Sequence, residues 1–277
     1  MRVPFVKVQK RRNIAFLGTQ YKHFLRSFSI EVCYAMIQAD STPSSLFVVE
    51  GNIGAGKSTF LKMLEKYMHA QIILEPTDQW QNIDGENILD LFYKDPKRWA
   101  YTFQLYAFIT RIQTQKAYTD VNHEPIQVLE RSVYSDRFCF AKNCYEMGSL
   151  SLLEWKMYRK CFNWLVDVYV QKPAAFIYLK TDPEICYSRI MRRKRSEEST
   201  ISLEYLKLLD RRHEEWLVEK KDLEACVEDI PVLILDNNYE FEDDIAIQKE
   251  HVKSIVTFMK KTFNYSDHAI LLDGVVL

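Results

Sequence analysis

Short apolar runs alternate with amphipathic segments over most of the chain. Runs rich in Val, Ile, Leu and Phe predict five buried strands, at 46–50, 72–75, 125–130, 174–179 and 231–235. Apolar residues that recur every three or four positions predict helices at 57–69, 87–93, 96–118, 151–170, 202–220 and 243–263, and a further helix that runs from 183 into a basic cluster at 189–195. Continuous apolar strands separated by helices predict an α/β fold, a mostly parallel sheet covered on both faces.

Several predicted helices carry start signals in their first residues. Ser151 and Glu154 have the spacing of a capping box. Asp95 and Asp182 each precede a Pro, which suits the first position of a helix, so we expect both to act as caps.

Charge is unevenly distributed along the chain. The first 30 residues contain seven Lys or Arg and no Asp or Glu, whereas residues 41–277 contain 30 basic and 36 acidic residues. A basic, acid-free start is typical of a mitochondrial transit peptide, but an extension that does not fold has the same composition, and Met36 is an alternative start. We therefore expect a basic extension over 1–45, one main domain over 46–263 and a tail over 264–277.

The composition excludes several classes of protein. A net charge of −1 argues against bulk nucleic-acid binding, and no apolar run approaches the length of a membrane span. The six Cys lack zinc-ligand spacing. Scattered thiols of this kind indicate an intracellular protein, cytoplasmic or, if residues 1–35 are a transit peptide, mitochondrial.

The strongest motif lies between the first predicted strand and helix. Residues 51–58, GNIGAGKS, match the phosphate loop G-x-x-x-x-G-K-[ST] in the context that this motif requires. Its backbone N–H groups bind phosphates, Lys57 reaches the β- and γ-phosphates, and Ser58 holds Mg²⁺. The predicted nucleoside triphosphate contacts are Gly51, Asn52, Ile53, Gly54, Ala55, Gly56, Lys57, Ser58 and Thr59.

Acidic residues end three other predicted strands, at Glu75, Glu130 and Asp236. Ligands of open α/β sheets gather at the carboxyl ends of strands, where Glu75 and Glu130 lie. Glu75 is the candidate general base, and Glu130, which precedes Arg131, is the candidate acid beside the metal. Taken singly, each carboxylate also fits a solvated strand end or a helix cap.

A basic cluster follows the fourth predicted strand. It contains Arg189, Arg192, Arg193, Lys194 and Arg195, with Glu197 and Glu198 directly after it. A solvated charged face has the same pattern, but the position between a helix and a polar turn suits a lid whose arginines close over phosphates.

Together these motifs resemble the deoxyribonucleoside kinases of the deoxycytidine/deoxyguanosine kinase type. The matching segments, within 46–263, are GNIGAGKST (51–59), EPTDQW (75–80), NILDLFY (87–93), RWAYTFQ (98–104), ERSVYSDRF (130–138), RKRSEE (193–198), LEYL (203–206) and PVLILD (231–236). The resemblance implies a P-loop NTPase-like fold with a five-stranded parallel sheet inside a helical shell, and a homodimer. It also implies in-line transfer of the γ-phosphoryl group of ATP or another triphosphate, with Mg²⁺, to a nucleoside 5′-hydroxyl.

The resemblance also implies roles for individual residues. Glu75 is the base that activates the hydroxyl, and Arg131 steadies the hydroxyl and the phosphates. The implied deoxynucleoside-binding residues are Trp80, Tyr93, Phe103, Gln104, Arg111, Asp136, Phe140 and Glu198. The implied further triphosphate-binding residues are the lid arginines Arg189, Arg193 and Arg195, and Phe241 beside the donor adenine.

Within the nucleoside set, the resemblance implies that Trp80, Phe103 and Phe140 sandwich the base and that Gln104 binds its edge. It also implies that Tyr93 and Glu198 hold the sugar 3′-hydroxyl. An Arg111–Asp136 pair implies deoxycytidine or purine deoxynucleosides rather than thymidine.

Some alternatives stay open at this point. Each aromatic residue alone fits a buried core, and Arg192 competes with Arg193 for one lid position. A nucleoside monophosphate kinase on the same scaffold would need basic residues near its acceptor, where Glu75 stands instead. A non-enzymatic relative of the kind found in respiratory complex I would not need Lys57, Glu75 and Arg131 together.

Overall fold

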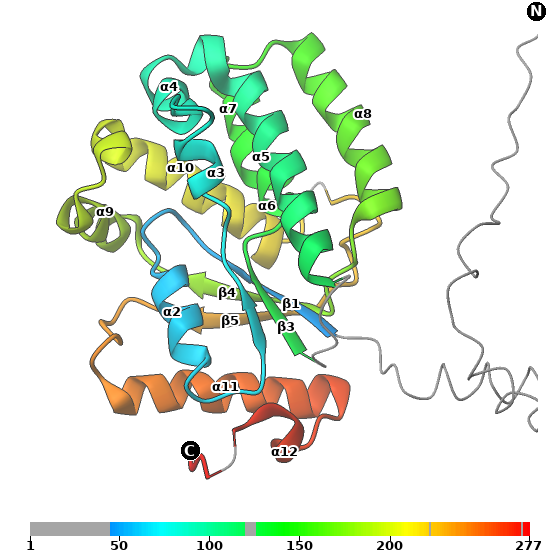
Figure 1. The fold of residues 1–277 in the computed structure, drawn as a ribbon, viewed down its shortest axis with the longest axis vertical. Coiled ribbons are helices and arrows are strands. Elements are labelled where there is room, and N and C mark those ends of the chain that lie inside the picture. The colour runs from blue at the N-terminus through cyan, green and yellow to red at the C-terminus, as the bar shows by residue number, and fades with distance from the viewer. Residues whose placement is uncertain (1–44, 120–125, 222, 273) are drawn as a thin grey trace, which may run out of the picture. The chain divides into compact units, whose positions relative to one another are not determined.

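The computed structural model describes residues 45–119, 126–221, 223–272 and 274–277. The described residues belong to one compact unit, and the predicted extension over 1–45 lies outside them except for Ser45, which begins β1. Five parallel strands form one sheet in the order β2–β3–β1–β4–β5 (Figure 1). Their bounds are β1 Ser45–Glu50, β2 Gln71–Ile73, β3 Ile126–Glu130, β4 Ala175–Lys180 and β5 Val232–Asp236. The predicted parallel α/β sheet is confirmed.

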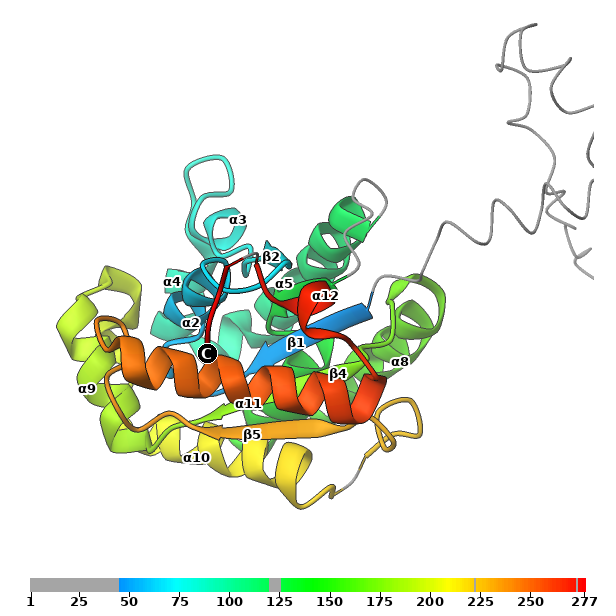
Figure 2. The ribbon, with the colours of Figure 1, turned by 90° about the horizontal axis from the view of Figure 1, so that it is seen from below.

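Helices cover both faces of this sheet, as Figures 1 and 2 show from two directions. One face packs against α2 (Lys57–Leu64), α11 (Ile245–Phe263) and α12 (Asp267–Ile270). The other packs against α5 (Pro96–Thr119), α8 (Leu152–Tyr169) and the π-helical segments η1 (Asp136–Ala141) and η3 (Glu214–Val218). The remaining helices are α3 Asp78–Gln81, α4 Ile88–Lys94, α6 Val133–Ser135, α7 Lys142–Glu146, α9 Pro183–Arg193, the 3₁₀ turn η2 Ser196–Thr200 and α10 Leu203–His213.

The continuous apolar pattern of the strands follows from this double covering. In β1, Phe47 and Val49 pack toward α2 and α11, whereas Leu46 and Val48 pack toward α5 and α8. Side chains that alternate between two buried faces must all be apolar, so no hydrophobic–polar alternation appears in the sequence.

Several helix boundaries differ from the predictions. The helix expected over 57–69 ends at Leu64, and Met68 then forms an isolated bridge to Leu271. The helix expected over 202–220 changes after His213 into the π-helical η3. The segment after residue 263 contains α12, whose Ile270 is buried against the body.

The start signals are confirmed at two helices and in part at a third. Ser151 and Glu154 form a reciprocal capping box, and Asp95 Oδ1 accepts a hydrogen bond from Arg98 N at 3.2 Å. Asp182 is the N-cap residue of α9 and precedes Pro183 as predicted, but within the described chain its side chain accepts no capping hydrogen bond. Its backbone N–H donates to Asn238 Oδ1 at 2.8 Å, which ties α9 to the loop after β5.

The strand order brings three predicted site segments to one edge. β3 lies between β2 and β1, and Val49 of β1 pairs with Glu130 of β3. The phosphate loop, Glu75 and Glu130 therefore all follow the carboxyl ends of neighbouring strands, where open α/β sheets bind their ligands.

Candidate active site

The phosphate loop connects β1 directly to α2. Gly54 (φ 79°) and Gly56 (φ 86°) have left-handed backbone conformations, and a Cβ atom at position 54 would collide with the carbonyl oxygen of Cys186 in α9. Lys57 Nζ donates to the carbonyl oxygens of Gly51 at 3.2 Å and Asn52 at 2.7 Å. The loop therefore curves around the Lys57 side chain, and it leads directly into the first turn of α2.

A cavity of about 430 Å³ lies beside this loop. Its loop-side lining comprises Ile53, Gly54, Gly56, Lys57, Ser58 and Thr59. All eight predicted nucleoside-binding residues also line it, namely Trp80, Tyr93, Phe103, Gln104, Arg111, Asp136, Phe140 and Glu198. The structure thus brings the phosphate loop and the predicted acceptor residues into one space.

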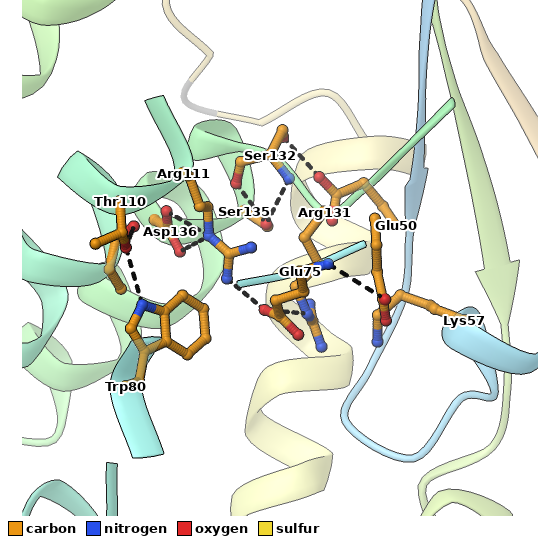
Figure 3. A network of polar contacts seen from close by, with 12 residues as sticks. Glu50, Lys57, Glu75, Trp80, Thr110, Arg111, Arg131, Ser132, Ser135 and Asp136 are labelled. Carbon is orange, nitrogen blue, oxygen red and sulfur yellow. Dashed lines mark hydrogen bonds and ion pairs between the residues drawn. The ribbon is translucent and has the colours of Figure 1, made fainter. Parts of the chain in front are cut away.

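Glu75 stands two residues beyond β2, between two arginines (Figure 3). Its Oε1 lies 2.5 Å from Arg111 Nη2 and 3.4 Å from Arg131 Nε. Burial raises the pKa of Glu75, but the charges of Arg111, Arg131 and Lys57 outweigh this effect and lower the pKa to about 2. Glu75 is therefore an ionised carboxylate beside the phosphate loop.

Arg111 also binds Asp136, so one guanidinium bridges two carboxylates. Its Nε lies 3.0 Å from Oδ1 and 2.9 Å from Oδ2 of Asp136. Burial raises the pKa of Asp136 to about 6, against the opposing effect of Arg111. Asp136 begins the π-helical η1, and π-helical turns within helices are frequent at functional sites.

Aromatic side chains form the walls of the cavity. Trp80 packs edge-on to Phe103 at 5.6 Å between ring centroids, and its Nε1 donates to Thr110 Oγ1 at 2.9 Å. The Arg111 guanidinium lies 4.9 Å over the Trp80 ring, and the Arg131 guanidinium lies 4.7 Å over the Phe140 ring. Aromatic faces next to fixed polar groups suit a flat, partly polar ligand such as a nucleobase.

Glu198 and Tyr93 lie at another part of the cavity wall. Arg193 binds Glu198 through two contacts, Nε to Oε2 at 2.6 Å and Nη2 to Oε1 at 2.5 Å. Arg195 Nη1 is 3.7 Å from Glu198 Oε1. Burial, followed by the charge of Glu198, raises the pKa of the Tyr93 hydroxyl, which keeps it a neutral hydrogen-bond donor.

The two predicted metal ligands are in direct contact. Ser58 Oγ donates to Glu130 Oε1 at 2.8 Å. These hard oxygen donors suit Mg²⁺, which binds through few protein ligands and keeps positions for waters and substrate phosphates. Over the described ranges, no cluster of three or more His, Cys, Asp or Glu could hold a metal by itself.

Five predicted triphosphate contacts lie outside the cavity lining, namely Gly51, Asn52 and Ala55 of the phosphate loop, and Arg189 and Phe241. Arg189 donates to Glu240 Oε1 at 3.1 Å and to the carbonyl oxygen of Tyr239 at 2.9 Å. Phe241 is buried, packs edge-on to Phe60 and lies next to Gly56. Arg189 and Phe241 both hold the connection between β5 and α11 against the loop.

Sequence reasoning assigned no role to three other residues here. Phe92 stacks on Phe103 with centroids 4.9 Å apart, and Tyr205 lines the cavity. Glu50, the last residue of β1, is completely buried directly before the phosphate loop. An acidic residue at the end of an otherwise apolar run was the one available signal for Glu50.

Comparison with known proteins agrees with this geometry. The family model for deoxynucleoside kinases matches residues 47–264. The chain is 40% identical to a probable deoxycytidine kinase of fowlpox virus, over 78% of this chain and 88% of the viral protein. It is also 40% identical to deoxycytidine kinase 2 of Gallus gallus and 39% identical to a mitochondrial deoxyguanosine kinase of Xenopus laevis, in each case over 76% of this chain. These matches cover 89% of the Gallus gallus protein and 88% of the Xenopus laevis protein.

Among the helices in the described ranges, none has the length and apolar character needed to cross a bilayer. The sheet order, the phosphate loop and the matches over most of the chain lead to one assignment. The chain belongs to the deoxynucleoside kinase family.

Proposed function

We propose that the protein transfers the γ-phosphoryl group of ATP or another nucleoside triphosphate to the 5′-hydroxyl of deoxyribonucleosides, giving monophosphates for nucleotide salvage. The observation that carries this proposal is the ionised Glu75 in the same cavity as Lys57 and Ser58 of the phosphate loop. The two arginines beside Glu75 are themselves paired with carboxylates, Arg111 with Glu75 and Asp136 and Arg131 with Glu75, so this side of the cavity suits a neutral hydroxyl better than an acceptor phosphate.

Glu75 is the general base of the proposed reaction. A pKa near 2 makes it fully ionised at neutral pH but a weak base. The phosphates of a bound triphosphate compete for Lys57 and Arg131, and each cation that turns toward them raises the pKa of Glu75 toward its ordinary range. Triphosphate binding thereby increases the basicity of Glu75 where the hydroxyl proton must be accepted.

Charge on the transferred group is offset by Lys57, Arg131 and the lid arginines Arg193 and Arg195. Ser58 and Glu130 would hold Mg²⁺, which would help to offset the negative charge of the triphosphate. Arg189 and Phe241 fix the loop after β5, where we place the donor adenine. The contact between Ser58 and Glu130 supports the metal assignment.

The nucleoside is bound between the aromatic walls. Trp80, Phe103 and Phe140 enclose the base, and the amide of Gln104 reads its edge. Tyr93 and Glu198 bind the sugar 3′-hydroxyl. The Arg111–Asp136 pair favours deoxycytidine and purine deoxynucleosides, and relatives named deoxycytidine kinase and deoxyguanosine kinase support this substrate class.

The domain plan and the assembly are further parts of the proposal. The kinase domain takes up 46–263 and acts inside the cell, in mitochondria if the N-terminal segment is a transit peptide. The protein forms a homodimer through α8, which exposes Leu153, Met157, Trp164 and Val168 on one helical face. An exposed apolar stripe of this kind is typical of a protein interface.

One assay separates the candidate functions. The purified chain is incubated with Mg²⁺, ATP labelled in its γ-phosphate, and in turn each deoxynucleoside and each nucleoside monophosphate. We expect label in 5′-monophosphates of deoxycytidine or the purine deoxynucleosides, and none with Lys57→Ala. Label in diphosphates alone would indicate a monophosphate kinase, and no label in any product would indicate a non-enzymatic relative.

A further inference from the structure

Glu50 is a buried carboxylate that the proposed reaction does not use. It ends β1, is 0% exposed and directly precedes Gly51 of the phosphate loop. Its neighbours along β1 are apolar, and an apolar side chain would complete the pattern of the strand. An ionised group in the interior is costly unless other groups compensate for the lost water.

The groups around Glu50 offset only part of the hydration that its carboxylate loses on burial. Ser132 Oγ donates to Glu50 Oε1 at 2.6 Å (Figure 3), but among the described residues Glu50 Oε2 has no hydrogen-bond partner. Three cations act on it from different elements, Arg131 after β3, Arg111 of α5 and Lys57 of α2. Burial outweighs these groups and raises the pKa of Glu50 to about 7. Such a group lowers the stability of the fold above neutral pH, so stability does not explain its presence.

The other titratable groups around this region carry no charge to pair with Glu50. Cys139 of η1 is a buried thiol whose pKa is raised, by burial and then by Glu50. His213 of α10 is completely buried, and burial together with the charge of Arg131 lowers its pKa to about 3. Glu50 therefore acts on Lys57 together with Glu130 and Glu75, and of these three carboxylates it is the one with 0% exposure.

Ser132 links Glu50 to a strained part of the active site. Arg131 has a left-handed backbone conformation with φ 61°, which is unfavourable for a non-glycine residue, and its N–H donates to the carbonyl oxygen of Val49 at 3.0 Å. Ser132 follows it, donates to Glu50 and accepts from Tyr134 N at 3.2 Å. The hydrogen bonds to Glu50 and from Tyr134 thus fix the position of the Ser132 hydroxyl. This in turn holds Arg131, the strained residue before Ser132, in place.

We propose that Glu50 is a positioning residue for phosphoryl transfer, which anchors Arg131 through the Ser132 hydroxyl and supplies a buried negative charge behind the phosphate loop. This inference rests on the proposed kinase function. It assigns Glu50 an effect on the rate of the chemical step rather than on nucleoside binding, because the nucleoside side of the cavity is made by other elements.

Two substitutions test the link. Glu50→Gln keeps the volume but replaces the charge-assisted hydrogen bond from Ser132 with a weaker neutral one, and Ser132→Ala removes the hydroxyl. Because misplacing a catalytic group by about 1 Å costs on the order of 100-fold, we expect kcat to fall about 10- to 100-fold in each variant. The KM for the nucleoside should stay within about twofold of wild type, a split that general loss of folding does not produce.

The double variant and a control complete the test. If Glu50 acts through Ser132, the double variant is no slower than the slower single variant, since each change removes the same charge-assisted hydrogen bond between Ser132 and the Glu50 carboxylate. Glu214→Gln is the matched control, because Glu214 accepts from Tyr178 OH at 2.9 Å and Tyr178 is the strand neighbour of Glu50. We expect the control to keep the wild-type kcat.

The inference is overturned if Glu50→Gln keeps kcat within about twofold of wild type, or if the two changes add fully in the double variant. A wild-type protein inactive on every deoxynucleoside would instead overturn the proposed function. The two failures are therefore distinguishable within one set of measurements.

Discussion

Replacing Glu50 by Gln should stabilise the protein against unfolding at high pH, even though it slows the reaction. The carboxyl has an ordinary pKa of 4.5, which burial raises to about 7 in the folded chain. Between these values the unfolded chain binds fewer protons than the folded chain, so the free energy of unfolding falls as pH rises. Below pH 4.5 the carboxyl is protonated in both states, and the cost disappears.

The gap between the two pKa values sets the size of the effect. At about 1.36 kcal/mol for each pH unit, it corresponds to an upper limit of about 3 kcal/mol above pH 7. In the unfolded chain the Glu50 carboxyl is already largely ionised at pH 5, so part of the destabilisation is present below that pH. About 2 kcal/mol of the destabilisation develops between pH 5 and pH 8. The amide of Gln leaves an N–H group without a partner, which costs stability. This cost does not depend on pH, so it cancels when the difference between variant and wild type at one pH is compared with the difference at another.

The assay is urea unfolding of wild type and Glu50→Gln at several pH values from 5 to 8. We expect the free energy of unfolding of the variant, relative to wild type, to increase by about 2 kcal/mol over this range. A difference that is constant with pH would show that Glu50 has an ordinary pKa, and the reasoning about its buried charge would then be wrong.

Further predictions concern substrate choice, assembly and metal. Asp136→Ala removes one of the two carboxylates that pair with Arg111. It should lower kcat/KM for deoxycytidine or purine deoxynucleosides about 10- to 100-fold and shift preference toward thymidine. Unchanged ratios of kcat/KM among four deoxynucleosides would contradict this. Trp164→Glu places a charge on the exposed face of α8 and should convert the dimer into a monomer by light scattering, whereas an unchanged mass would exclude this face. EDTA should abolish phosphoryl transfer, Mg²⁺ should restore it, and Ser58→Ala should raise the Mg²⁺ concentration required; transfer that persists in EDTA would refute the metal assignment.

The layered fold and much of the site could be predicted from local sequence patterns. Five apolar runs with helices between them are sufficient for a parallel sheet, and the phosphate loop marks the edge where ligands bind. Glu75 and Glu130 could be found because each follows such a run. The order of the strands then brings them together, although neither residue carries a local signal of the other.

Contacts between distant segments could not be predicted in this way. Glu50 and Ser132 are 82 positions apart, and nothing in either segment indicates their hydrogen bond. The hydrogen bond from the Asp182 backbone N–H to Asn238 Oδ1 likewise joins segments that are 56 positions apart, and neither segment indicates it. The π-helical turn that begins at Asp136 likewise depends on packing against α5, which local propensity does not encode.

The most direct test of the account is the rate of Glu75→Gln in phosphoryl transfer, measured together with the affinity of the same variant for its deoxynucleoside. The amide keeps the shape of the side chain but cannot accept a proton. A positioned base contributes about 10²- to 10⁴-fold, so we expect kcat to fall by that factor with nucleoside affinity close to wild type. A variant that retains the wild-type kcat would contradict the claim that Glu75 activates the acceptor hydroxyl beside the phosphate loop.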